Sequence, residues 1–273
     1  MIMQAKDVYV SFKKENQKRL WGKERQQVLK GVHLILKEGE CLGIIGESGS
    51  GKSTFGKVLL GLLKPDQGEV TLDGMPLYGR SYQSGSPGCD HKISVVFQDY
   101  TSSVNPRFRV KDIIGESLRF IMKTSKTKFK KEEHVEELLR QVGLDSSFKD
   151  RYPHELSGGE LQRVCIARAI AVRPKVILLD EAISSLDVST QTQIMDLLIE
   201  LRAKYSFSYI FITHDLTAIT YLCDRVMFFH EGQIVEQVDD ISRLSSLKNK
   251  YARKLLRAVM PIDIKPEWES KVI

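Results

Sequence analysis

The sequence has no long hydrophobic run. A membrane-spanning helix requires about 18 consecutive apolar residues, and no stretch of the 273 residues approaches that length. The first residues also lack the basic segment followed by an apolar one that marks a secretory signal. We therefore expect no helix that crosses a bilayer, and we expect a cytoplasmic location.

Cysteine is scarce and scattered. The four cysteines contain no C-x-x-C pair, and they stand at Cys41, Cys89, Cys165 and Cys223. This spacing disfavours a metal site or a disulfide framework and indicates free thiols in a reducing compartment.

Neither sign of charge dominates the composition. The 41 basic and 35 acidic residues leave a net charge of +6, which fits nucleic acid, an anionic membrane surface or no specific partner. The densest basic cluster, at residues 123–131, is interpreted as a solvated linker between helices. A hydrophobic content of 42% is ordinary for a protein that buries a core.

Residues 46–54 read GESGSGKST and match the spacing G-x-x-x-x-G-K-[ST]. A loop with this spacing turns successive backbone N–H groups inward, where they bind the phosphates of a nucleotide. Lys52 can reach the terminal phosphates as a positive charge, and the Ser53 hydroxyl can ligate Mg²⁺. We expect the nucleotide to contact Gly46, Glu47, Ser48, Gly49, Ser50, Gly51, Lys52, Ser53 and Thr54.

The flanks of this loop argue against a chance match in a glycine-rich surface loop. The apolar residues 41–45 before it predict a buried parallel strand, and residues 55–63 after it have helical apolar spacing. Strand, glycine loop and helix in this order bring a phosphate to a helix N-terminus.

Strand and helix patterns alternate along the chain. Strands are predicted at 5–12, 28–37, 69–72 and 93–97, and again at 176–179, 209–213 and 226–229. Between these two groups, residues 110–122 and 132–142 have helical periodicity, which predicts a helical insertion. The alternation predicts a parallel sheet covered by helices, followed after residue 236 by a mostly helical segment.

Four apolar residues at 176–179 end in the carboxylates Asp180 and Glu181. The C-terminal end of such a strand is where parallel sheets bind ligands. Asp180 can hold Mg²⁺ there, and Glu181 is placed to orient and deprotonate a water aimed at the terminal phosphate. The alternative is an ordinary buried strand followed by two solvated acids, and the phosphate loop favours the catalytic interpretation.

Ser157 and Glu160 form an S-x-x-E capping box before the helical residues 161–172. Capping alone leaves Gly158 and Gly159 unexplained, because each glycine in a helix costs about 1 kcal/mol relative to alanine. The pair makes sense if their amides meet an anion closely. A second anion site implies a second phosphate group, or the same nucleotide approached from another subunit.

These motifs, in this order, resemble the nucleotide-binding subunit of an ATP-binding-cassette (ABC) transporter over about residues 5–235. LSGGELQR at 156–163 resembles that family's signature sequence, which other P-loop families lack. The resemblance implies an α/β fold with a RecA-like P-loop NTPase core, an N-terminal antiparallel β-subdomain and an inserted α-helical subdomain. It implies an ATPase domain at 1–236 (core 1–98 and 157–236, helical subdomain 99–156) and a C-terminal helical tail at 237–273.

In this family two subunits sandwich two ATP molecules, each bound with Mg²⁺. The resemblance therefore implies that one subunit's signature residues contact the γ-phosphate of the ATP held by the partner's loop; these residues are Ser157, Gly158, Gly159 and Glu160. Asp187, which ends the sequence SSLD at 184–187, would couple the two sites along the dimer interface.

Three more positions match family elements. Gln98 matches the glutamine loop, which senses Mg²⁺ and the attacking water, so the implied Mg²⁺ ligands are Ser53, Gln98 and Asp180. His214 matches the switch histidine, which contacts the γ-phosphate and holds the catalytic glutamate and its water. Phe12 resembles the aromatic that stacks on adenine; Tyr9 is an alternative, and core packing is a competing explanation for Phe12.

The sequence departs from the family pattern in two places. Glu160 stands where glutamine is usual, but both residues complete a capping box. Ala182 and Ile183 replace the usual Pro-Thr, which alters loop stiffness and removes no catalytic group. The site is therefore expected to hydrolyse ATP through Glu181, His214 and Gln98.

Subfamily features narrow the transported substrate. Residues 98–107 and 251–261 resemble the extended glutamine loop and the C-terminal region of the dipeptide, oligopeptide and nickel importer group. Many members carry a cysteine cluster for an iron–sulfur centre near the C-terminus, and no cysteine follows Cys223, so none is expected. The segment 181–184 looks most like the nickel importer's second ATPase subunit. Nickel or a nickel–metallophore complex is therefore the favoured substrate, and peptides are the alternative.

The resemblance also implies the partners. They are a second ATPase subunit that is a different chain, two transmembrane permease subunits contacted around residues 100–116, and indirectly an extracytoplasmic substrate-binding protein. The subunit would lie at the cytoplasmic face of the membrane. A soluble ABC ATPase acting on nucleic acid or ribosomes is an alternative class; one cassette without a basic linker argues against it, so no nucleic acid is expected.

Overall fold

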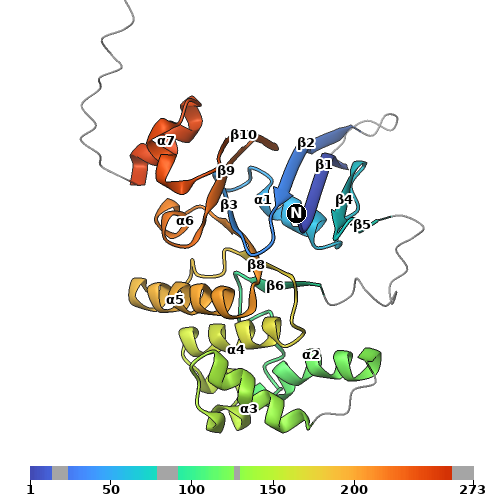
Figure 1. Cartoon of the computed structure of the whole chain (residues 1–273), viewed down its shortest axis with the longest axis vertical. Coiled ribbons are helices and arrows are strands. Elements are labelled where there is room, and N and C mark those ends of the chain that lie inside the picture. Colours follow the sequence, from blue (N-terminus) through green and yellow to red (C-terminus); the bar gives the residue numbers. More distant parts are fainter. Residues whose placement is uncertain (14–23, 79–91, 126–129, 260–273) are drawn as a thin grey trace, which may run out of the picture.

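The computed structural model describes residues 1–13, 24–78, 92–125 and 130–259 (Figure 1). Cys89, residues 126–129 of the basic cluster and residues 260–273 of the tail lie outside these ranges. Figure 1 shows α2 and α3 at one end of an elongated molecule, with the antiparallel sheet and α7 toward the other end.

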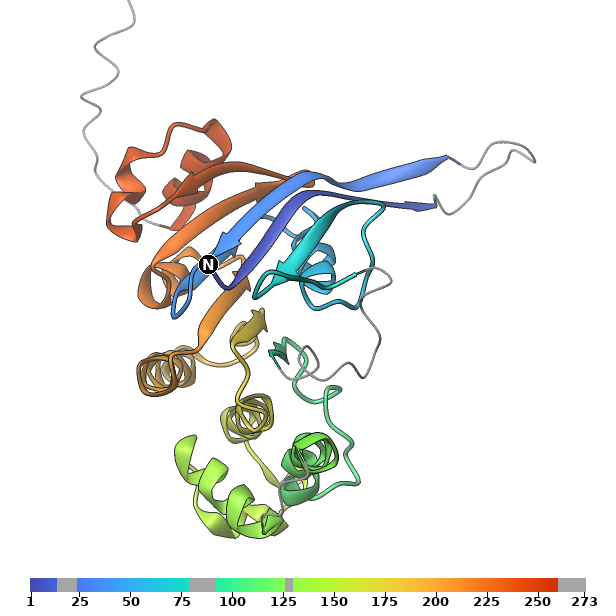
Figure 2. The same cartoon turned by 45° about the vertical axis from the view of Figure 1, so that its right-hand side comes forward.

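The N-terminal sheet is antiparallel, with strand order β2-β1-β4-β5 (Figure 2). The strands are β1 (Met3–Lys13), β2 (Arg25–Leu36), β4 (Gln67–Leu72) and β5 (Met75–Pro76). The implied antiparallel β-subdomain is confirmed. Residues 25–27, which precede the strand predicted at 28–37, also belong to β2, because they continue the pairing with β1 as far as Lys13 opposite Arg25.

The central sheet has six strands in the order β10-β9-β3-β8-β7-β6. Its strands are β3 (Cys41–Ile45), β6 (Ile93–Phe97), β7 (Val176–Asp180), β8 (Ser208–Thr213), β9 (Arg225–His230) and β10 (Gln233–Val238). All pairs from β9 to β6 are parallel, as predicted.

β10 is an unpredicted edge strand, and it runs antiparallel to β9. Glu231 and Gly232 join the two strands, both with positive φ (45° and 81°), and such turns favour a tight hairpin. The partly polar sequence QIVEQV lacks the continuous apolar run that predicts the other strands of this sheet. The helical segment predicted after residue 236 consequently begins only at η3 (Ile241–Ser246).

Helices pack on both faces of the central sheet. The predicted helix at 55–63 begins three residues earlier and ends near Gly61, whose φ is 77°. That helix is α1 (Lys52–Leu59). The other helices that pack on the central sheet are α4 (Gly158–Ile170), α5 (Val188–Tyr205), α6 (Leu216–Leu222) and α7 (Lys250–Val259).

β3 shows how the core is divided. Leu42 and Ile44 pack with the antiparallel sheet and α1, whereas Cys41 and Ile45 pack with the helices on the opposite face. A strand buried on both faces reads as a continuous apolar run, which is the signal that predicted it.

The helical insertion consists of α2 (Val110–Ser125), α3 (Lys131–Gln141), η1 (Ser146–Asp150) and η2 (Pro153–Glu155). Both α2 and α3 pack against α4, so α4 joins the insertion to the sheet. Over the residues covered by the structure, no helix combines the length and apolarity needed to cross a bilayer.

Candidate functional site

Four predicted site residues lie at one edge of the central sheet because each follows the last residue of a parallel strand. Gly46 follows β3, Gln98 follows β6, Glu181 follows β7 and His214 follows β8. The strand register aligns these ends: Ile45 pairs with Thr213, and Asp180 pairs with both Ile212 and Phe97. The carboxyl edge of the sheet therefore gathers the residues that the motifs predicted separately.

The phosphate loop encloses the side chain of Lys52, which is only 4% exposed. Its ammonium donates hydrogen bonds to the carbonyl oxygens of Gly46 (2.7 Å) and Glu47 (2.8 Å). Burial lowers the pKa of Lys52, and the nearby carboxylates of Glu181, Asp180 and Glu47 oppose that shift. An ammonium has three N–H donors, so one remains for a phosphate oxygen.

Glycine is required at three positions of this loop. A Cβ on Gly46 would lie 2.1 Å from the backbone oxygen of Phe229, so no side chain fits there. Gly49 and Gly51 have φ values of 78° and 109°, in the region that side chains disfavour. The loop shape is therefore built into its glycines.

A pocket opens above this loop. Its lining is Val28, Ser48, Gly49, Gly51, Lys52, Ser53, Thr54 and Glu181. The GESGSGKST motif predicted six of these residues, and the acidic pair that ends β7 predicted Glu181. Val28 of β2 was not predicted. Gly46, Glu47 and Ser50 are not part of this lining. Among the described residues, none of 157–160 lines it either, so the signature motif is not part of this chain's own pocket.

Asp180 ends β7 with a carboxylate that fits a cation. Burial, followed by the charge of Glu181, raises the pKa of Asp180, and Lys52 opposes the rise. The Asp180 Oδ1 atom is buried without a hydrogen-bond partner in the described part of the chain. An orphaned carboxylate oxygen beside a phosphate loop matches the oxygen donors that Mg²⁺ prefers.

Glu181 and His214 lie close together across the ends of β7 and β8. His214 Nδ1 is 3.4 Å from Glu181 Oε2, and the glutamate side chain is 18% exposed while the histidine is 59% exposed. Glu181 has a positive φ of 48°, and its N–H donates to Ile212 O at 2.8 Å. Such backbone strain in a non-glycine residue is concentrated at functional sites.

Gln98 is linked to the same carboxylate segment through one serine. Its amide nitrogen donates to Ser184 Oγ at 3.4 Å, and Ser184 Oγ donates to Glu181 O at 3.0 Å. The contact joins the end of β6 to the turn after β7, so the glutamine reaches the predicted catalytic segment.

The capping box at the start of α4 is present. Ser157 N donates to Glu160 Oε2 at 2.7 Å, and Glu160 N donates to Ser157 Oγ at 3.3 Å. The first of these bonds is the main cause of a lowered pKa at Glu160.

The two glycines after Ser157 also have an intramolecular explanation that the sequence did not indicate. A Cβ on Gly158 would lie 2.6 Å from the Tyr100 hydroxyl, and one on Gly159 would lie 2.5 Å from Thr190 Cγ2. Close approach of an anion is therefore not the only reason why residues 158 and 159 must be small. Thr190 carries no motif signal and Tyr100 belongs to the segment that resembles the extended glutamine loop, so only the fold brings the two side chains to this helix.

Asp187 caps α5. Its carboxylate accepts hydrogen bonds from Thr190 N (3.0 Å), Thr190 Oγ1 (2.7 Å) and Ser189 Oγ (2.6 Å). The two hydroxyls, then the amide, hold the pKa of Asp187 well below its usual range. Asp187 therefore orders the start of α5 within its own chain.

Phe12 is not a core residue. Its side chain is 44% exposed near the end of β1, opposite Gln26, so core packing does not explain it. Tyr9, the alternative aromatic, packs over Gly31, where a Cβ would lie 2.7 Å from the tyrosine hydroxyl. Phe12 is the freer of the two rings.

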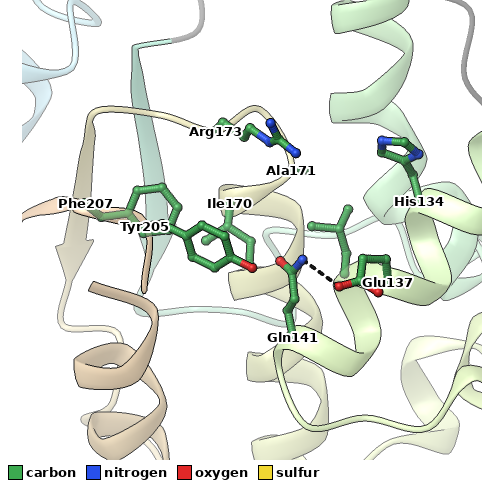
Figure 3. Close-up of a pocket in the computed structure, with 9 residues that line it drawn as sticks. His134, Glu137, Gln141, Ile170, Ala171, Arg173, Tyr205 and Phe207 are labelled. Atoms are coloured by element: carbon green, nitrogen blue, oxygen red, sulfur yellow. Dashed lines mark hydrogen bonds between the residues drawn. The ribbon is translucent and has the colours of Figure 1, made fainter. Parts of the chain in front are cut away.

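A second pocket lies away from the phosphate loop, at the junction of α3 with the core (Figure 3). His134, Glu137 and Gln141 approach it from α3, Tyr205 approaches it from the end of α5, and Phe207 precedes β8. It contains no residue of the predicted site and holds no orphaned polar atom in the described ranges.

The family model described as ABC transporter matches residues 29–184. The chain is similar to the metal-staphylopine import system ATP-binding protein CntF of Staphylococcus aureus (45% identity, 93% of this chain and 98% of the relative). It is similar to the nickel import ATP-binding protein NikE of Brucella suis (41%; 87% and 88%).

Two further matches are to ATP-binding proteins of the same kind. The oligopeptide transport ATP-binding protein OppF of Streptococcus pyogenes is 36% identical over 94% of this chain and 81% of its own length. Among solved structures, a dimeric ATP-binding cassette in a post-hydrolysis state with ADP and Pi has a TM-score of 0.72 at 30% identity, covering 87% of this chain and 98% of that cassette.

Proposed function

The chain belongs to the ABC transporter family of ATPases, and we propose that it energises the import of nickel or a nickel–metallophore complex. The observation that carries the substrate proposal is its 45% identity, over 93% of its length, to an ATP-binding protein named for metal-staphylopine import. Similarity to a nickel import ATP-binding protein supports the same substrate class.

In the proposed cycle, Glu181 is the general base. Glu181 lines the phosphate pocket, and His214, 3.4 Å away, would hold its carboxylate and contact the γ-phosphate. A positioned base of this kind accelerates proton transfer by about 10² to 10⁴. Gln98 would register the occupied site through Ser184, to which it donates a hydrogen bond.

The residues fit a magnesium nucleotide. Ser53 lines the pocket, Asp180 offers an orphaned oxygen, and Gln98 lies at the neighbouring strand end; these three would hold Mg²⁺. When bound, the cation neutralises phosphate charge and orients the γ-phosphate for attack by water. No iron–sulfur cluster is proposed.

The proposed assembly has two ATPase subunits. Residues 157–160 are absent from the lining of this chain's own pocket, which supports their use against ATP held by a partner. A solved dimeric cassette of similar fold supports pairing. We assign the partner as a different ATPase chain, with two transmembrane permease subunits that meet residues 100–116 at the cytoplasmic face of the membrane and, beyond them, an extracytoplasmic binding protein.

Segment 100–116 is physically tied to the signature helix. Arg168 of α4 donates to Ser103 O at 2.6 Å and to Ser103 Oγ at 3.2 Å, and Tyr100 packs against Gly158. Movement of α4 on ATP binding would therefore move the surface proposed to contact the permease. This connection supports a transporter over an enzyme that acts alone.

The substrate proposal is tested by uptake in the host after deletion of the gene. Accumulation of radioactive nickel, supplied free and as a metallophore complex, should fall to background. Wild-type and Lys64→Ala chains should restore it, whereas Lys52→Ala should not, because only Lys52 lines the pocket.

The same strain distinguishes the alternatives. Loss of oligopeptide uptake with normal metal uptake would replace the proposal by peptide import, which the similarity to the oligopeptide relative supports. Normal uptake of both, with tight and salt-sensitive nucleic-acid binding by the +6 chain, would favour the soluble ATPase class.

A further inference from the structure

The C-terminal helix contacts the phosphate loop through one side chain. The backbone N–H of Glu47 donates a hydrogen bond of 2.9 Å to the hydroxyl of Tyr251, in the first turn of α7. The two residues are 204 positions apart, and no motif places them together.

The peptide unit that makes this contact is the one that binds Lys52. The amide between Gly46 and Glu47 has its N–H on Tyr251, while its carbonyl accepts from Lys52 Nζ at 2.7 Å. Hydrogen bonds at the two ends of one amide polarise each other and fix its plane. Tyr251 thus binds the N–H end of the peptide unit whose carbonyl end binds Lys52.

The tyrosine ring is itself held by a stacking partner. Its ring stacks on His230, the last residue of β9, with centroids 3.9 Å apart and planes at 28°. A phenol is neutral at physiological pH, and burial raises the pKa of Tyr251 further above that range. A neutral hydroxyl with an immobilised ring is a fixed acceptor for the loop amide.

Helix α7 is anchored by contacts independent of the loop. Glu236 of β10 accepts hydrogen bonds from the amides of Lys248 (2.7 Å) and Asn249 (2.8 Å). Asn249 Oδ1 in turn accepts from Tyr251 N at 2.8 Å, and Ala252 is fully buried in the core. The helix is therefore a rigid support for Tyr251.

We propose that Tyr251 is a positioning residue for ATP, which keeps the 46–47 peptide oriented so that Lys52 is presented to the phosphates. Without the hydroxyl, that peptide can rotate and the binding-competent loop is only part of the population. The apparent dissociation constant then rises by the inverse of the competent fraction. This inference rests on ATP binding at the loop and is independent of the transported substrate.

The test is Tyr251→Phe, which removes one oxygen and keeps the ring stacked on His230. Binding of MgADP to the full chain, measured by calorimetry, should weaken about three- to tenfold, the range expected for loss of one hydrogen bond. In steady-state hydrolysis KM for ATP should rise by a similar factor with kcat nearly unchanged. A merely structural role would lower the melting temperature without this KM shift.

The matched control is Tyr221→Phe. Tyr221 donates to Asp196 at 2.6 Å on the outer side of α6, so this variant also loses a tyrosine hydrogen bond but not one to the loop. It should bind MgADP as the wild type does. Wild-type affinity in Tyr251→Phe, or a fall in kcat at constant KM, would overturn the proposal; failure of the wild-type chain to bind MgADP would instead refute the proposed nucleotide site.

Discussion

Asp180 shows at the scale of one residue that this site is arranged for a ligand and not for stability. Its carboxylate ends a buried strand, keeps an oxygen without a partner in the described structure, and has a raised pKa because of burial. Since folding raises the pKa of this acid, the folded chain binds protons more readily than the unfolded chain. Ionised Asp180 therefore destabilises the protein at neutral pH unless a cation is bound.

Asp180→Asn should consequently stabilise the nucleotide-free chain while removing Mg²⁺-dependent hydrolysis. A gain of about 1 kcal/mol corresponds to a melting temperature about 2–4 °C higher. The gain should be largest at neutral pH and shrink as the pH falls toward the ordinary aspartate pKa, below which Asp180 is protonated in both states. Calorimetric melting curves from pH 4 to 7.5 test this, with exposed Asp196→Asn as the control. A lower melting temperature for Asp180→Asn at pH 7 would contradict it.

At the scale of one element, α4 contacts both the segment after Gln98 and the start of α5. Its N-terminus carries the capping box of Ser157 and Glu160, its glycines pack on Tyr100 and Thr190, and Arg168 binds the segment after Gln98. Capping accounts for the order of its first turn. The proposed contact with a partner's ATP is a different property of Ser157, and substitutions that preserve capping can test it alone.

Ser157→Asp and Ser157→Asn form a matched pair for this purpose. Both residues cap helices as well as serine does, so both variants should melt within about 2 °C of the wild type. Only the aspartate places a negative charge where a phosphate is expected, and it should reduce ATPase turnover of the assembled dimer at least about tenfold relative to asparagine. Equal turnover of the two variants would argue against phosphate contact at Ser157.

Arg168→Ala tests the connection from α4 to the permease-facing segment. Because the arginine touches Ser103 and not the phosphate pocket, basal ATPase activity should stay within about twofold of the wild type. Transport per ATP in the reconstituted importer should fall by about 2- to 30-fold, the usual range for a coupling residue. Arg140→Ala, on the exposed side of α3, is the control. Unchanged coupling in Arg168→Ala would exclude this route.

At the scale of the whole molecule, one chain carries the phosphate loop, the proposed base and the proposed magnesium ligands on one sheet edge, whereas the signature motif lies outside the lining of its own pocket. The pocket lining lacks residues 157–160, and Asp187 lies at the exposed start of α5. Two chains would complete the site by exchange. Binding of ATP would then be converted into dimer closure, and hydrolysis into opening.

Glu181→Gln should trap the closed state. The variant keeps the nucleotide contacts and loses the base, so turnover should drop at least about 100-fold while ATP-dependent dimerisation with the partner subunit becomes persistent. Light scattering after size exclusion, with ATP and with ADP, measures this. Glu200→Gln on α5 is the control and should dimerise only transiently. Continued normal turnover in Glu181→Gln would refute Glu181 as the base.

The sequence by itself determined the local chemistry of this protein. The GESGSGKST spacing predicts the phosphate loop, and the apolar runs before Gly46, Asp180 and His214 predict the parallel strands whose ends the structure aligns. The S-x-x-E pattern predicts the capping box that the structure contains. These features were readable because each depends on residues within one strand, turn or helix start.

Only the tertiary structure decided the contacts between distant segments. It paired β10 antiparallel to β9, exposed Phe12, packed Tyr100 and Thr190 against the glycines of α4, and joined Tyr251 to the amide of Glu47. None of these pairs has a local sequence signal, because a long-range contact depends on how whole elements pack. The phosphate loop is a local motif, but its orientation depends on a helix 200 residues away.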